Sequence, residues 1–307
     1  AEIYRYNCYH AFVKIYHAKF DTENAVVYCL KGIDVAAKNK NDFQRANSYR
    51  ALFSLYFNLR KRDSAIKYAA YAMDITEKIN DTSNIATMYG NLSRIYNEMD
   101  LYDKAIDFGK KGIELGQQYK DYKGMLISMN NLGNCLMGIN REPEAIPVFE
   151  NLLLEGQKHK RTRSVLNALI NLGILYFNMA DEQNTTRIAK KMKEMEPTFD
   201  AADRMGESYR HLVYGYDLTL QRKFGLAENE FMAGLKIAEA DSITAPLESL
   251  YLAMSTIKYA EQDFAAATVW DNKWGALDQT LKRQEMSEYA LDMEAKYETE
   301  RKEATIK

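Results

Sequence analysis

Asparagine side chains recur at one position in three stretches of the sequence. Asn91, Asn131 and Asn171 are spaced 40 residues apart. An asparagine amide carries N–H donors and a carbonyl acceptor, so it can pair with the main chain of an extended peptide whatever the peptide's sequence. The same amides could instead join neighbouring elements of the fold, and the sequence leaves both interpretations open.

Further polar residues accompany these asparagines and extend the candidate surface. Nearby apolar side chains, Phe57, Met137 and Phe177 among them, could line pockets, although methionine and aromatic residues at helical spacing usually belong to a core. We therefore predict a ligand-binding or peptide-binding groove made by Asn91, Asn131, Asn171, Arg94, Asn130, Asn134 and Asn97.

Metal binding was considered for two histidines near the start of the chain. His10 and His17 fall on one face of a predicted helix, but Lys14 lies between them and no third ligand has a suitable spacing. The three cysteines show no metal-ligand spacing, and their odd number argues against a disulfide framework. We predict no metal site and no cofactor.

Residue patterns typical of enzymes are not found in the sequence. It contains no nucleophile elbow, no phosphate-binding glycine loop and no Cys–His arrangement with an orienting partner. Paired carboxylates such as Glu228 and Glu230 are two residues apart, so on a helix they point to different sides. We predict that the chain has no catalytic residues and is not an enzyme.

Composition limits the remaining classes of partner. The chain has 307 residues, of which 47% are apolar and 27% charged, so it can bury a core without disulfides. Its net charge of −2 gives no basic surface for nucleic acid, and we predict that this segment binds none. No apolar run approaches the roughly 18 residues of a membrane span, and Ala1 opens no signal-peptide pattern.

The elements that must position these side chains are helices in a repeat. Aromatic and aliphatic residues return every 40 residues, and within a unit their spacing places them on one helical stripe. A small residue then marks where a second helix crosses. We predict an all-α array of about seven helical hairpins over residues 1–275, stacked as a right-handed α–α superhelix with a concave surface. The repeated residues include Tyr9, Tyr49 and Tyr89; Leu52, Leu92, Leu132 and Leu172; and Ala25, Ala65, Ala105 and Ala145.

This pattern resembles the tetratricopeptide repeat family. Its signature of Leu-Gly, then Tyr, then Ala and an aromatic residue reads most clearly in Leu132-Gly133 with Ala145 and Phe149, and in Leu172-Gly173 with Tyr176. The period departs from the family, because it is 40 residues rather than the usual 34. HEAT and armadillo repeats share the longer period but lack this combination. The resemblance implies a partner-binding protein in which Asn91, Asn131 and Asn171 hold a peptide's main chain.

The last part of the chain, residues 276–307, has a different composition and contains no glycine or proline. Met286, Ala290, Met293 and Tyr297 would form a narrow apolar seam on one long helix, which could cap the last hairpin or pair with a second copy to give a homodimer. The charged stretch from Ala290 resembles the segment that leaves the repeat array in a family of Bacteroidetes membrane regulators.

That second resemblance implies a location and a role. The chain would be the periplasmic sensor part of an inner-membrane two-component or transcriptional regulator, with its membrane span outside this segment. Its ligand would be a peptide or protein, or a small glycan-type signal. The alternative is a free-standing cytoplasmic scaffold that assembles other proteins, and the sequence leaves it open.

Overall fold

The protein is a series of helices joined by short turns. The computed structural model describes the backbone of residues 2–19 and 21–306, and the side chains of 4–17, 19, 21–284 and 286–287. Those residues form fourteen α-helices and one 3₁₀ turn, with no strand. The chain divides into two compact units, Ala1–Asn140 and Arg141–Lys307. The prediction of an all-α array of about seven helix pairs is confirmed.

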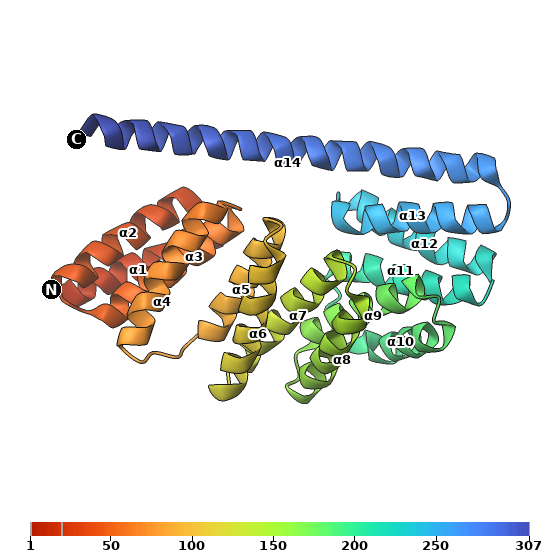
Figure 1. Ribbon diagram of the computed structural model, residues 1–307, viewed down its shortest axis with the longest axis horizontal. Coiled ribbons are helices and arrows are strands. Elements are labelled where there is room, and N and C mark those ends of the chain that lie inside the picture. The colour runs from red at the N-terminus through yellow and green to blue at the C-terminus, as the bar shows by residue number, and fades with distance from the viewer. Residues whose placement is uncertain (1, 20, 307) are drawn as a thin grey trace. The chain divides into compact units, whose positions relative to one another are not determined.

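Unit 1 contains the first seven helices, and the two members of each complete pair lie side by side (Figure 1). Its core holds Leu52, Leu92 and Leu132, and the predicted small residues Ala65 and Ala105 are completely buried where helices cross. The helices are α1 (Glu2–Ala18), α2 (Thr22–Lys38), α3 (Asp42–Asn58), α4 (Arg62–Lys78), α5 (Ile85–Glu98), α6 (Tyr102–Gln118) and α7 (Tyr122–Gly138).

Unit 2 contains the remaining helices and a second core, in which Phe231, Leu250 and Met254 are completely buried. Its last helix runs without a break across the predicted boundary between residues 275 and 276. The division into a repeat array and a C-terminal helix stays a prediction. The elements are α8 (Glu142–Lys158), α9 (Thr162–Asn178), α10 (Glu182–Met195), η1 (Glu196–Thr198), α11 (Arg204–Leu220), α12 (Phe224–Ala240), α13 (Thr244–Ala260) and α14 (Phe264–Ile306).

The turns between helices share one backbone conformation. A non-glycine residue with positive φ recurs every 20 residues as far as Ala180, which has a φ of 53°. The next N–H typically donates to the carbonyl five residues earlier, as from Asp181 to Tyr176 at 2.9 Å, which closes the end of the helix. The residues at these helix ends are Lys40, Arg60, Asn80, Asp100, Lys120, Asn140, Lys160, Ala180, Arg222, Ser242 and Gln262, and Asn84, just before α5, also has a positive φ.

Replacing Ala180 by glycine is expected to raise the free energy of unfolding by about 1 kcal/mol, because an alanine Cβ is strained in the left-handed region and glycine is not. Denaturation by urea measures the change. Asn140→Gly is the matched control at an equivalent turn with a φ of 56°. Asparagine tolerates this conformation, so its substitution should give a distinctly smaller gain. Equal gains at both sites would contradict the explanation.

The repeat is interrupted between α10 and α11. Helix α10 ends early, and a 3₁₀ turn follows it. After Ala180 the next residue with positive φ is Arg222, which comes 42 residues later, whereas two regular steps of 20 residues would give 40. Arg210 is buried, at 8% exposure, and its Nε and Nη1 have no hydrogen-bond partner among the described residues. Glu196 approaches its Nε to 3.5 Å. Arg210 lies on the first helix of its pair. The first helices of other pairs have smaller or apolar residues at the position that matches Arg210, namely Ser48, Ser128, Ala168 and Leu250.

Candidate binding surface

The candidate residues of unit 1 lie along two neighbouring helices. Their spacing is that of one helical face, while the opposite sides of the same helices carry the buried residues Leu92 and Leu132. We use the name first-helix face for the exposed and half-buried positions Thr87, Asn91, Arg94 and Asn97 of α5 together with Ile127, Asn130, Asn134 and Met137 of α7.

Helices α5 and α7 approach each other closely, which brings the two halves of this face together. The Ser128 hydroxyl is shared between the Gly124 carbonyl of its own helix, at 2.9 Å, and the Ala86 carbonyl of α5, at 3.2 Å. The Asn131 amide donates to the Gly90 carbonyl at 2.8 Å. A Cβ on Gly124 would lie only 2.5 Å from the backbone nitrogen of Thr87, so glycine permits this approach. The two helices therefore form a continuous surface.

The three repeated asparagines have different surroundings. Asn131 is buried, and its amide joins α7 to α5, which is the structural alternative that the sequence left open for these residues. Asn91 is half-buried on α5, and Asn171 is half-buried on α9 in unit 2. A shared role in holding a peptide's main chain stays a prediction.

Arg94 is the charged residue of the first-helix face. Its guanidinium lies over the Phe57 ring of α3, 3.9 Å from the centroid, and its Nε is 3.5 Å from Glu98 Oε1. Partial burial lowers the pKa of Arg94, an effect that Glu98 opposes, yet arginine stays a cation at neutral pH. Stacking on Phe57 fixes the guanidinium in place while its side chain remains 46% exposed.

Amide and hydroxyl groups supply the rest of the polar capacity. Asn97, Asn130 and Asn134 are half-buried on the face. The Asn130 Oδ1 and the Thr87 Oγ1 are both buried without a hydrogen-bond partner among the described residues. Thr87 is not among the predicted groove residues, although it lies four residues before Asn91 on the same stripe.

Phe177, which the sequence offered as possible pocket lining, belongs to the core of unit 2 instead, together with Tyr216. The rings of Phe177 and Tyr216 are stacked with centroids 3.8 Å apart, and Tyr216 also contacts the buried ring of Phe231. Both pack in the cluster formed by α9, α11, α12 and α13. The core interpretation, which the sequence left open, therefore describes them.

The described residues contain no group of three His, Cys, Asp or Glu side chains placed to hold a metal ion. His10 stacks on Tyr6, with ring centroids 6.1 Å apart, and burial lowers the pKa of its imidazole. Over the same described range, no helix is long and apolar enough to cross a membrane. Of the predicted C-terminal seam, Met286 is exposed, while the side chains of Ala290, Met293 and Tyr297 lie outside the described residues.

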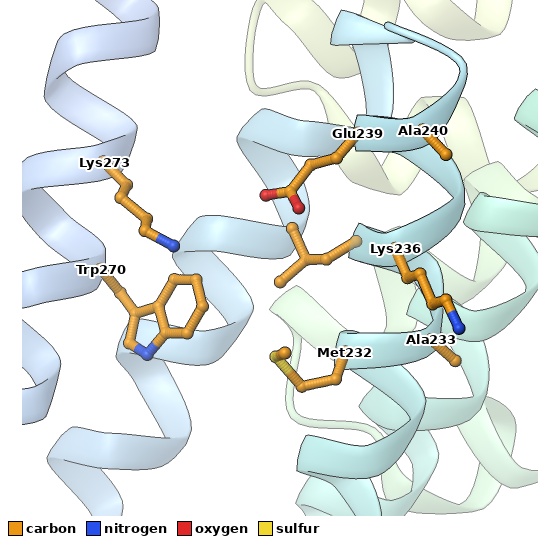
Figure 2. Close-up of a pocket in the computed structure, with 8 residues that line it drawn as sticks. Met232, Ala233, Lys236, Glu239, Ala240, Trp270 and Lys273 are labelled. Atoms are coloured by element: carbon orange, nitrogen blue, oxygen red, sulfur yellow. The ribbon is translucent and has the colours of Figure 1, made fainter.

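Unit 2 has a pocket of about 710 Å³ that the sequence analysis did not predict (Figure 2). It lies between α12 and α14, and none of the candidate residues lines it. No sequence signal pointed to it, because its lining combines the core residue Leu235 with surface positions of two helices that are separated by α13 along the chain. The lining residues are Met232, Ala233, Leu235, Lys236, Glu239, Ala240, Trp270 and Lys273.

Comparison with known proteins supports the repeat interpretation. Residues 86–118, which cover α5 and α6, match the tetratricopeptide repeat family model. No curated protein sequence matches the chain. The matched segment contains the α5 half of the first-helix face, including Arg94.

Solved structures share the fold at low sequence identity. Aspartyl phosphate phosphatase F from Bacillus subtilis is 14% identical, with a TM-score of 0.73 over 91% of this chain and 71% of that one. A Rap protein complexed with Competence and Sporulation Factor is 13% identical, with a TM-score of 0.66 over 92% and 78%. A tetratricopeptide repeat protein from Parabacteroides merdae is 16% identical, with a TM-score of 0.56 over 94% and 99%. These similarities establish a helical repeat solenoid.

Proposed function

We propose that this tetratricopeptide repeat array is a non-catalytic domain that binds an extended peptide or protein segment on the first-helix face. The observation that carries the proposal is the continuous strip of polar side chains on α5 and α7, with Arg94 fixed over Phe57 at one side. The Rap protein complexed with Competence and Sporulation Factor shows that an array of similar fold binds another molecule.

The polar groups of the first-helix face are better suited to bind the main chain of a peptide than to recognise one particular side chain. Asn97, Asn130 and Asn134 can donate to peptide carbonyls and accept from peptide N–H groups, so they would hold an extended segment with little sequence preference. Arg94 would add a fixed cation for an acidic side chain or a terminal carboxylate. Asn131 would support the surface from below, because its amide already binds the Gly90 carbonyl.

Binding can be tested by selecting peptides on the purified protein from a random 12-residue library and measuring their affinity by calorimetry. The double variant Arg94→Ala/Asn130→Ala is expected to bind at least about tenfold more weakly, since each lost charged or amide contact costs about 1 kcal/mol or more. Asp107→Ala/Lys110→Ala, two exposed positions on α6, is the matched control. Undiminished binding by the first variant would overturn the proposed surface.

We further propose that the domain is the extracytoplasmic, periplasmic sensor part of a membrane-bound two-component or transcriptional regulator. The support is the resemblance of the stretch from Ala290 to the exit segment of Bacteroidetes regulators. Helix α14 would lead from the array toward a membrane span outside this chain or pair with a second copy. A small glycan-type signal is a further possible ligand.

The second candidate is a cytoplasmic scaffold, favoured by the fold alone, since repeat solenoids commonly assemble other proteins. Reading the gene downstream of this segment separates the two functions. A membrane span followed by an output module supports the sensor, whereas a reading frame that ends near Lys307 supports the scaffold.

A further inference from the structure

The pocket between α12 and α14 combines an apolar base with a charged end. On α12 its residues follow one stripe, and on α14 Trp270 and Lys273 are one turn apart. Figure 2 shows the indole of Trp270, the thioether of Met232 and the carboxylate of Glu239 directed into the space between the two helices. Its volume of about 710 Å³ lies in the range of sites that bind small molecules.

The apolar base rests on the core of unit 2. Leu235 is only 2% exposed and belongs to that core, while Met232 is partly exposed beside it. Tyr251 of α13 packs under Trp270 with ring centroids 6.0 Å apart, which holds the indole at the wall of the pocket. A ligand with an apolar body would bury surface mainly against Met232 and Trp270, with Leu235 at the floor of the pocket.

The charged end holds one cation and one anion. Lys273 Nζ lies 4.2 Å from the centre of the Trp270 ring and 5.7 Å from that of Tyr251, so two aromatic rings position the ammonium. Glu239 Oε1 accepts a long hydrogen bond of 3.3 Å from the Tyr251 hydroxyl. In Figure 2 these two groups face each other across the gap, whereas Lys236 points away from it.

We infer that this pocket binds a free amino acid with a large apolar side chain. The ligand's carboxylate would pair with Lys273, its ammonium with Glu239, and its side chain would lie on Trp270, Met232 and Leu235. The carboxylate of a fatty acid paired with Lys273 would be repelled by the Glu239 carboxylate. The ammonium of a simple amine paired with Glu239 would be repelled by the Lys273 ammonium. Only a ligand with both charges satisfies both ends of the pair.

Three small molecules of nearly the same shape separate these possibilities. L-Leucine carries both charges, 4-methylpentanoate lacks the ammonium, and isopentylamine lacks the carboxylate. The fluorescence of Trp270 reports binding when Trp274→Phe makes it the sole tryptophan of the chain. We expect a saturable change with leucine at concentrations up to about 20 mM, and at least about tenfold weaker binding of the other two. Calorimetry on the unsubstituted protein gives the same comparison if Trp274→Phe impairs folding.

Variants then test the two charged contacts. Lys273→Met and Glu239→Gln should each weaken leucine binding about tenfold or more. Lys282→Met is the matched control, since Lys282 lies on the same helix, is 71% exposed and pairs with Asp278. Equal binding of all three molecules, unchanged binding by the Lys273 and Glu239 variants, or no saturable signal in either measurement would overturn the inference. Because the first-helix face lies in unit 1, peptide binding there is measured independently.

Discussion

Replacing Gly124 by alanine is expected to lower the free energy of unfolding by about 3 kcal/mol. The added Cβ would lie 2.5 Å from the backbone nitrogen of Thr87 and 2.6 Å from the Ala86 Cβ. Neither atom can move without displacing α5, so the helices would separate and strain the hydrogen bonds that Ser128 and Asn131 donate to α5 carbonyls. Urea denaturation followed by circular dichroism measures the loss.

The same helix supplies the control for this prediction. Gly138 ends α7, and a Cβ built there meets nothing within 4 Å. Gly138→Ala should therefore stabilise the protein by about 0.5–1 kcal/mol through the lower entropy of the unfolded chain. If both substitutions change stability in the same direction, close approach of α5 and α7 is not the cause.

Replacing Leu132 by alanine is expected to cost about 2–5 kcal/mol, the range for a cavity left by a buried leucine. Leu132 is only 4% exposed, and it packs against α6 so tightly that a Cβ on Gly109 would lie 3.0 Å from the Leu132 Cβ. Because each hairpin of a solenoid completes its core with its neighbours, the loss should destabilise α5 and α6 as well as α7.

Hydrogen exchange of the backbone amides shows where the Leu132→Ala protein opens. Faster exchange is expected throughout α5, α6 and α7. Leu101→Ala is the control, because Leu101 is 41% exposed and its truncation leaves no buried cavity. Faster exchange confined to the residues next to position 132 would contradict the coupling of neighbouring hairpins.

The repeat architecture could be predicted from the sequence because its signals recur. A leucine such as Leu92 or Leu132 is weak evidence alone, but its return every 40 residues beside alanines such as Ala105 fixes the helix pairs. The turns recur at a regular spacing, but non-glycine residues occupy their left-handed positions. The turn propensity of the residues at any single turn would therefore not have predicted it. The fold could be predicted because the same residue pattern recurs in successive repeat units.

The candidate site was less predictable because sequence position does not say which way an amide points. Asn91 and Asn131 share a repeat position, yet α7 approaches α5 closely enough for Asn131 to reach the Gly90 carbonyl. Arg210 was missed for a similar reason, since a charged residue on a helix is normally exposed. The pocket between α12 and α14 depends on the distance between these two helices, which no pattern of neighbouring residues in the sequence predicts.

Helix α14 is continuous over 43 residues, from its packing on α13 to Ile306. At 1.5 Å per residue it is about 64 Å long, so it acts as a lever. A tilt of one degree at the end held by α13 displaces the far end by about 1 Å, as for any rod of this length. A small adjustment around Trp270 would thus become a movement of atomic size at a distant point.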